Sequence, residues 1–92
     1  MWSVYILECA DGTLYTGITT SLDRRLLEHN ETSKGAKYTR SRRPVKLVAF
    51  CFVKDRSAAL KLESKVKSLK KSEKIAYLTK EKSNDLEKTK WS

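Results

Sequence analysis

Two β-rich runs joined by an Asp-Gly pair constrain this fold more than any other feature of the sequence. The runs span residues 2–9 and 13–19, and Ala10, Asp11 and Gly12 lie between them. β-branched and aromatic residues on both sides of an Asp-Gly turn are typical of an antiparallel hairpin, because Asp and Gly tolerate the positive φ angles of tight turns. Residues 2–19 are therefore predicted to form a β-hairpin.

The rest of the chain alternates between helical and extended patterns. Thr20 stands before an amphipathic stretch with Asp23 near its start, so we expect Thr20 to cap a helix. Residues 45–53 are apolar apart from Lys46, which predicts a strand covered on at least one face and placed centrally in the sheet. The elements expected after the hairpin are a helix at about 21–30, this strand, a helix at 58–69 and a short helix at 72–78. The order β-β-α-β-α-α predicts an α+β domain, with a three-stranded antiparallel sheet flanked by helices.

Length and charge narrow the possible functions. The 92 residues are enough for one domain, which we place at 1–79, followed by a polar, Lys-rich C-terminal tail at 80–92. Twenty Lys and Arg against 11 Asp and Glu give a formal net charge of +9. This excess favours a polyanionic partner, with nucleic acid ahead of an anionic membrane surface.

Localisation and cysteine chemistry follow from shorter segments. The N-terminal residues lack the basic region of a signal peptide, and no apolar run approaches the roughly 20 residues of a membrane span. We therefore expect a soluble, cytoplasmic protein with no membrane partner. Cys9 and Cys51 lie in apolar stretches without a CxxC motif. They are predicted to be buried apolar residues rather than disulfide partners or zinc ligands.

Three ionisable residues break the apolar pattern of the predicted helices. On the first helix, His29 falls between the inward-facing Leu22 and Leu26, and Arg25 lies at the margin of the same face. On the second long helix, Glu63 lies inside the apolar stripe. Charged side chains are rarely buried unless they are paired or bind a metal. The structural alternative is that Arg25 and Glu63 form an ion pair and that His29 caps a backbone carbonyl.

The hairpin adds two tyrosines and a glycine. Tyr5 and Tyr15 lie on adjacent strands, so their hydroxyl groups can share one surface if the register allows. Gly17 has no side chain, and therefore leaves room for a close approach. Tyrosines in strands are usually packing residues, but their combination with an inward Arg, His and Glu is harder to explain by packing.

A basic segment precedes the third strand. Between positions 34 and 46 there are six basic residues, one tyrosine and no acid. An aromatic residue among basic side chains can stack or donate a hydrogen bond at a phosphate backbone; the alternative is a solvated basic loop. The residues expected to bind nucleic acid are Lys34, Lys37, Tyr38, Arg40, Arg42, Arg43 and Lys46.

From about Ser3 to Leu78 the chain resembles the GIY-YIG nuclease domain, in particular its small stand-alone branch. The two name motifs are present as Val4-Tyr5-Ile6 and Tyr15-Thr16-Gly17. The first motif departs from the family pattern, because Ser3-Val4 replaces its leading Gly-Ile. The family often has an Asn after the metal-binding Glu, and Asn84 is the candidate here. The further matching stretches are Leu22-x-x-Arg25-x-x-x-His29, Gly35-Ala36-Lys37-Tyr38-Thr39 and residues 59–63.

The resemblance implies phosphodiester hydrolysis with one divalent metal ion, Mg²⁺ or Mn²⁺, and with Glu63 as its sole protein ligand. Tyr5 is then the general base or holds the attacking water, and nearby positive charge assists its proton loss. Tyr15 positions the scissile phosphate or the water. Gly17 is the structural residue of the second motif.

The resemblance also implies roles for residues on and after the first helix. Arg25 stabilises charge on the phosphoryl oxygens in the transition state, as suits a guanidinium that stays protonated. His29 hydrogen-bonds the phosphate or orients Tyr5. Tyr38 contacts a phosphate nearby.

The expected activity is that of a metal-dependent endonuclease acting on DNA, with RNA left open. Single-stranded, branched or damaged DNA is a more plausible substrate than a specific sequence, because no helix is evident for reading base edges. The main alternative is a non-catalytic nucleic-acid-binding module with a vestigial site, and a second is an adaptor that binds an acidic protein. The chain is expected to be a monomer or a weak dimer.

Overall fold

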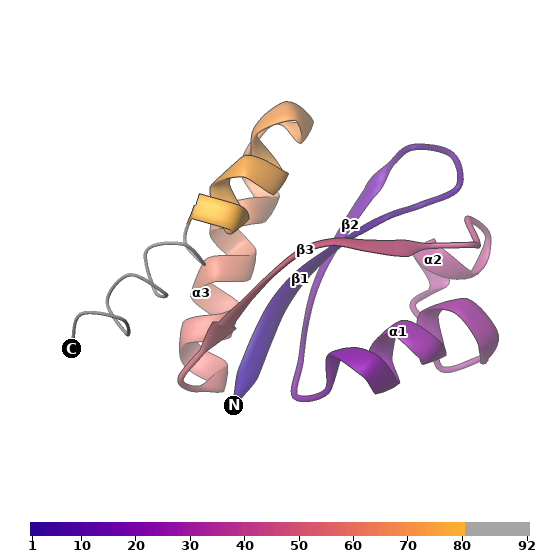
Figure 1. Cartoon of the computed structure of the whole chain (residues 1–92), viewed down its shortest axis with the longest axis horizontal. Coiled ribbons are helices and arrows are strands. Elements are labelled where there is room, and N and C mark those ends of the chain that lie inside the picture. The colour runs from indigo at the N-terminus through magenta and orange to yellow at the C-terminus, as the bar shows by residue number, and fades with distance from the viewer. Residues whose placement is uncertain (81–92) are drawn as a thin grey trace.

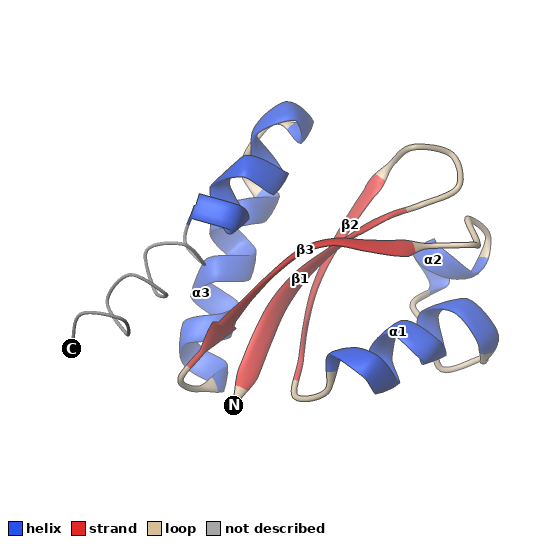
Figure 2. Ribbon diagram, viewed as in Figure 1, coloured by secondary structure: helices blue, strands red, loops and turns tan. Residues whose placement is uncertain are grey.

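Three antiparallel strands form the sheet that carries the predicted tyrosines (Figures 1 and 2). We describe residues 1–80 of the protein in a computed structural model. Strands β1 (Trp2–Glu8), β2 (Leu14–Thr19) and β3 (Lys46–Val53) pair in the order β2-β1-β3. The predicted α+β class, the hairpin and the antiparallel sheet are confirmed.

The prediction that the third strand is central is wrong, because β1 lies between the other two strands. Residues 3–7 of β1 are all at most 2% exposed, so both faces of this strand are covered. In β3, by contrast, Phe52 is 51% exposed. The apolar run of β3 therefore reflects one well-covered face and one partly open face, not a central position.

The helices match the predicted order but begin at different caps. Helix α1 (Leu22–Glu31) is capped by Ser21, whose Oγ accepts a hydrogen bond from the Arg24 amide at 3.4 Å. The predicted cap Thr20 is therefore wrong. Helix α3 (Arg56–Lys67) begins earlier than expected because the Asp55 carboxylate accepts a hydrogen bond from the Ala58 amide at 2.8 Å.

Two further helical segments complete the described chain. The short helix predicted at 72–78 is confirmed and spans 71–80. A one-turn helix, α2 (Lys37–Arg40), lies within the basic segment, which has no helical periodicity in its sequence. Within residues 1–80, no helix is both long and apolar enough to cross a bilayer. Residues 81–92, which include Asn84 and most of the predicted tail, lie outside the described residues.

The sheet separates two hydrophobic cores, and α3 and α1 lie on opposite sides of it (Figure 1). On the α3 side, Val4 and Ile6 pack with Ala59, Val66 and Leu78. On the α1 side, the buried cluster contains Tyr5, Leu7, Cys9 and Val45, and Leu22 and Leu26 of α1 pack against it. Cys9 and Cys51 are free and buried, as predicted. The α1 side of the sheet is the face that carries Tyr5.

Candidate active site

The register of the hairpin brings Tyr5 and Tyr15 to the same face of the sheet. Tyr5 is paired with Gly17, and Tyr15 is paired with Leu7, so the two tyrosines are diagonal neighbours. Their ring centroids are 6.4 Å apart. A Cβ on Gly17 would lie 2.5 Å from the Tyr5 Oη and 3.1 Å from Tyr15 Cε2. The glycine is therefore required here because the Tyr5 ring lies across it.

His29 lies fully buried beneath the tyrosines, at the inner face of α1. Its Nε2 is 2.9 Å from the Tyr5 Oη, and its Nδ1 is 2.7 Å from the Thr39 Oγ1. The imidazole thus contacts side chains rather than capping a backbone carbonyl. Because His29 is 0% exposed, it cannot contact a phosphate directly, and of its two implied roles only the orientation of Tyr5 fits this geometry.

Burial sets the protonation state of both members of this pair. Burial, followed by the positive charges of Arg25 and Arg43, lowers the pKa of His29 from 6.5 to about 4. The ring is therefore neutral at pH 7. Burial raises the pKa of Tyr5 from 10.0 to about 12, and the hydrogen bond and charge of Arg25 act in the opposite direction. The positive charge of Arg25 lowers the pKa of Tyr5, as expected. In the isolated protein, however, burial raises this pKa by more than Arg25 lowers it.

Arg25 reaches toward the phenols from the margin of α1. Its Nη1 donates hydrogen bonds to Glu28 Oε1 at 3.0 Å and to the Lys34 carbonyl at 2.9 Å. Its ion pair is therefore with Glu28, one turn away on the same helix, and not with Glu63. Glu28 is half-buried. Arg25, the residue expected to stabilise the phosphoryl oxygens, is therefore already paired with a negative charge on its own helix.

Glu63 lies on α3 and acts on Tyr5 through its charge. Its side chain is 18% exposed, and its Oε2 lies 3.6 Å from Lys67 Nζ one turn along the helix. After burial, Arg25 and Tyr15, the negative charge of Glu63 contributes to the raised pKa of Tyr5. Besides burial, groups on β2, α1 and α3 therefore affect the pKa of the Tyr5 phenol.

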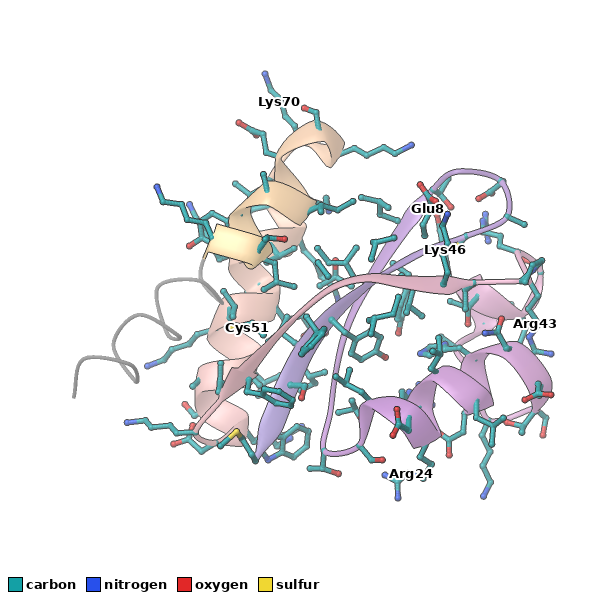
Figure 3. The ribbon with its side chains drawn as sticks, viewed as in Figure 1. Glu8, Arg24, Arg43, Lys46, Cys51 and Lys70 are labelled. Carbon is teal, nitrogen blue, oxygen red and sulfur yellow. The ribbon has the colours of Figure 1, made fainter. Side chains whose placement is uncertain are left out.

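Arg43 and Arg42, both predicted to bind nucleic acid, make hydrogen bonds within the fold. Arg43 lies beside the C-terminal end of α1 (Figure 3), where it donates to the carbonyls of His29 at 2.6 Å, Glu28 at 3.2 Å and Thr32. The Glu28 carbonyl also accepts the Thr32 amide at 3.3 Å, and carbonyls in the last turn of a helix are the ones that need added donors, so Arg43 caps α1 and helps to place His29.

Arg42 fixes the basic segment to the hairpin. Its Nε donates to the Asp11 carboxylate at 3.0 Å, and its guanidinium lies 3.8 Å from the centroid of the Tyr38 ring. The Tyr38 ring in turn stacks on Tyr15 at 6.1 Å between centroids, with an interplanar angle of 29°. Tyr38 is 37% exposed, so its edge faces solvent next to Tyr15.

The other basic residues of the segment differ in whether their charged groups form an ion pair within the fold. Lys46 forms an exposed ion pair with Glu8 at 3.2 Å, at the turn end of the hairpin (Figure 3). Lys34, Lys37 and Arg40 are exposed, and within residues 1–80 their charged groups form no ion pair. Of the six predicted cations, three therefore make no ion pair in the described part of the chain, and the binding of nucleic acid by the set stays a prediction.

Sequence reasoning missed the part played by Thr39, which is 0% exposed and contacts His29. Thr39 lies in a polar, basic segment without periodicity, so nothing in the pattern indicated that it faces inward. It also missed Asp11 as the anchor of Arg42. Within residues 1–80, no group of three or more His, Cys, Asp or Glu side chains converges.

Comparisons with known proteins agree on one family. The model of the GIY-YIG catalytic domain matches residues 1–76. A UPF0213 protein of Desulfotalea psychrophila is 62% identical over 68 residues, which cover 74% of this chain and 62% of that relative. A UPF0213 protein of Syntrophus aciditrophicus is 54% identical over 75 residues, which cover 82% of this chain and 86% of that relative.

A solved structure is similar over most of the chain. The solution NMR structure of a UPF0213 protein from Bacillus halodurans superimposes with a TM-score of 0.54 at 43% sequence identity. The match covers 89% of this chain and 87% of that chain.

Proposed function

Since the chain belongs to the GIY-YIG catalytic domain family, we propose that it is a metal-dependent endonuclease that hydrolyses phosphodiester bonds in DNA. The observation that carries this proposal is the convergence on the Tyr5 phenol. Tyr15, Arg25 and Glu63, which come from three different elements, all shift its pKa. Groups whose pKa values are perturbed by specific charged partners are typical of functional sites.

Glu63 is the residue that would hold the metal ion, Mg²⁺ or Mn²⁺. A carboxylate is the hard oxygen donor that these cations prefer. In the isolated protein this carboxylate has the Lys67 ammonium as its counter-cation, so a metal ion would replace one positive charge with another. When bound, the ion supplies charge stabilisation to the phosphoryl oxygens and the leaving group.

Tyr5 serves as the base that accepts a proton from the attacking water, with His29 holding the phenol in place. Arg25, which is part-exposed beside the phenol, stabilises the charge that develops on the phosphoryl oxygens. Tyr15 and the edge of Tyr38 position the phosphate. The high pKa of Tyr5 keeps its phenol protonated at neutral pH in the isolated protein, so the phenol would act as a base only after releasing its proton to water, which added positive charge nearby would favour.

Lys34, Lys37 and Arg40 guide the nucleic-acid backbone to this site. Phosphate contacts orient a substrate but carry no sequence information. We therefore propose selection by DNA structure, such as single-stranded, branched or damaged DNA, rather than by base sequence.

The test is a panel of labelled single-stranded, duplex, flap and junction DNAs, and matching RNAs, incubated with Mg²⁺, Mn²⁺ or EDTA. We expect cleavage of at least one DNA that is lost with EDTA and in Glu63→Gln and Arg25→Ala. Glu31→Gln and Arg24→Ala are matched controls, because both residues are exposed on α1 and Arg24 points away from the sheet (Figure 3). Binding of these DNAs without cleavage under any condition would instead identify a non-catalytic binding module.

A further inference from the structure

The buried Thr39 hydroxyl lies between two possible acceptors. Which of them accepts its hydrogen decides which ring nitrogen of His29 is protonated. Thr39 Oγ1 is 3.0 Å from the Ala36 carbonyl oxygen and 2.7 Å from Nδ1 of His29. The Ala36 oxygen already accepts the amides of Thr39 at 3.1 Å and Arg40 at 3.0 Å. A carbonyl oxygen has two lone pairs, so the hydroxyl hydrogen is better used at the closer Nδ1.

A second donor points to the same nitrogen. The Ala36 amide lies 3.5 Å from Nδ1 of His29 and is directed at it. Two donors therefore converge on Nδ1, which must be the unprotonated nitrogen. A neutral imidazole carries one N–H, and this hydrogen is then on Nε2, 2.9 Å from the Tyr5 Oη.

We propose that Thr39 is a positioning residue that places the His29 proton on Nε2, so that His29 donates a hydrogen bond to the Tyr5 oxygen. The phenolic hydrogen of Tyr5 is then not held by His29 and can pass as a proton to solvent water in the site, which leaves the phenolate. Once it leaves, the phenolate keeps a fixed N–H donor, and a hydrogen bond to the charged form of a group favours that form. Thr39 thus acts through His29 and contacts neither the phosphate nor the metal.

The surroundings of the pair support a neutral, donating imidazole. The charged and titratable groups that act on His29 or Tyr5 come from α1, α3, β2 and the segment before β3: Arg25, Glu28, Glu63, Tyr15 and Arg43. The nearby arginines disfavour a positive imidazolium. If His29 instead accepted the Tyr5 proton, it would become a buried cation close to Arg25 and Arg43. Burial and the repulsion between these positive charges disfavour that state.

The tautomer can be measured without any substrate or metal. His29 is the single histidine of the chain, so two-bond ¹H–¹⁵N correlations of the full-length ¹⁵N-labelled protein report on its ring alone. We expect the Nε2–H tautomer in the wild type and in Thr39→Ser, and a gain of the Nδ1–H tautomer in Thr39→Val. A wild-type ring protonated at Nδ1, or a Thr39→Val spectrum identical to that of the wild type, would overturn the proposal.

The kinetic consequence rests on the proposed function and is tested separately. On a cleaved DNA, Thr39→Val should lower kcat by roughly 10- to 100-fold, the range expected for one hydrogen bond to a charged group, with KM little changed. Thr39→Ser should restore kcat. An unchanged kcat in Thr39→Val would remove Thr39 from the support of Tyr5. If the wild type itself cleaves nothing, the proposed function fails, and the NMR measurement still decides the tautomer.

Discussion

Gly17 and Tyr5 face each other across β1 and β2, and a Cβ on Gly17 would lie 2.5 Å from the Tyr5 Oη and 2.6 Å from its Cζ. Tyr5 is only 2% exposed, so its ring cannot move aside without disturbing His29. The glycine of the second motif is therefore coupled to the tyrosine of the first by contact, not by backbone conformation.

Gly17→Ala should displace the Tyr5 ring, destabilise the fold by about 1–3 kcal/mol through overpacking and abolish cleavage. Gly12→Ala is the matched control: Gly12 has a φ of 83° and nothing within 4 Å of an added Cβ, so it should cost about 1 kcal/mol but leave cleavage intact. Urea unfolding and cleavage assays at a temperature where both variants are folded measure these effects. Full activity in Gly17→Ala would refute the coupling.

The basic segment should separate into binding and structural residues. Lys37→Gln and Arg40→Gln should each lower the slope of log affinity against log salt by about one, as expected for one lost phosphate contact, with no change in Tm. Arg43→Gln should instead lower Tm, because three carbonyls near the end of α1 each lose the hydrogen bond that Arg43 donates.

Salt-dependent DNA-binding titrations and thermal unfolding of the same variants test this division. The result that would contradict it is a stable Arg43→Gln protein with a reduced salt slope, or unchanged slopes in both other variants.

Acid should destabilise the protein through His29. Its pKa is about 4 when folded and 6.5 ordinarily, so the unfolded chain binds the extra proton. The stabilisation from the neutral ring is complete above pH 6.5 and is lost as the pH falls toward 4. The loss is on the order of 3 kcal/mol. Urea unfolding at pH 7, 6, 5 and 4 measures it, and His29→Gln is expected to show a flatter profile over this interval.

Lys67 should compete with the metal ion for Glu63. The two side chains are 3.6 Å apart and Lys67 is 57% exposed, and exposed pairs of this kind contribute about 0.2–1 kcal/mol. Lys67→Met should therefore strengthen Mn²⁺ binding up to about fivefold in the absence of nucleic acid, as followed by electron paramagnetic resonance. Lys61→Met, at an exposed position of α3, is the control. Equal Mn²⁺ affinities in all three proteins would place the metal away from Glu63.

Local patterns were sufficient for the elements and for the direction of most key side chains. An Asp-Gly turn between β-rich runs specified the hairpin, and helical periodicity placed His29 and Glu63 on inner faces. These signals work because the direction of a side chain within a helix or strand depends on its own element. The same signals misplaced Thr20 as a cap and β3 as a central strand, since capping geometry and strand order depend on neighbouring segments.

The sequence by itself determined which chemical groups the protein holds and which strands and helices carry them. Only the tertiary structure decided the partners that come from other segments: Thr39 for His29, Asp11 for Arg42, and the α1 carbonyls for Arg43. Partner choice among residues distant in sequence, and the pKa values that follow from burial, depend on how the elements pack against one another. Periodicity within a single element carries no information about that packing.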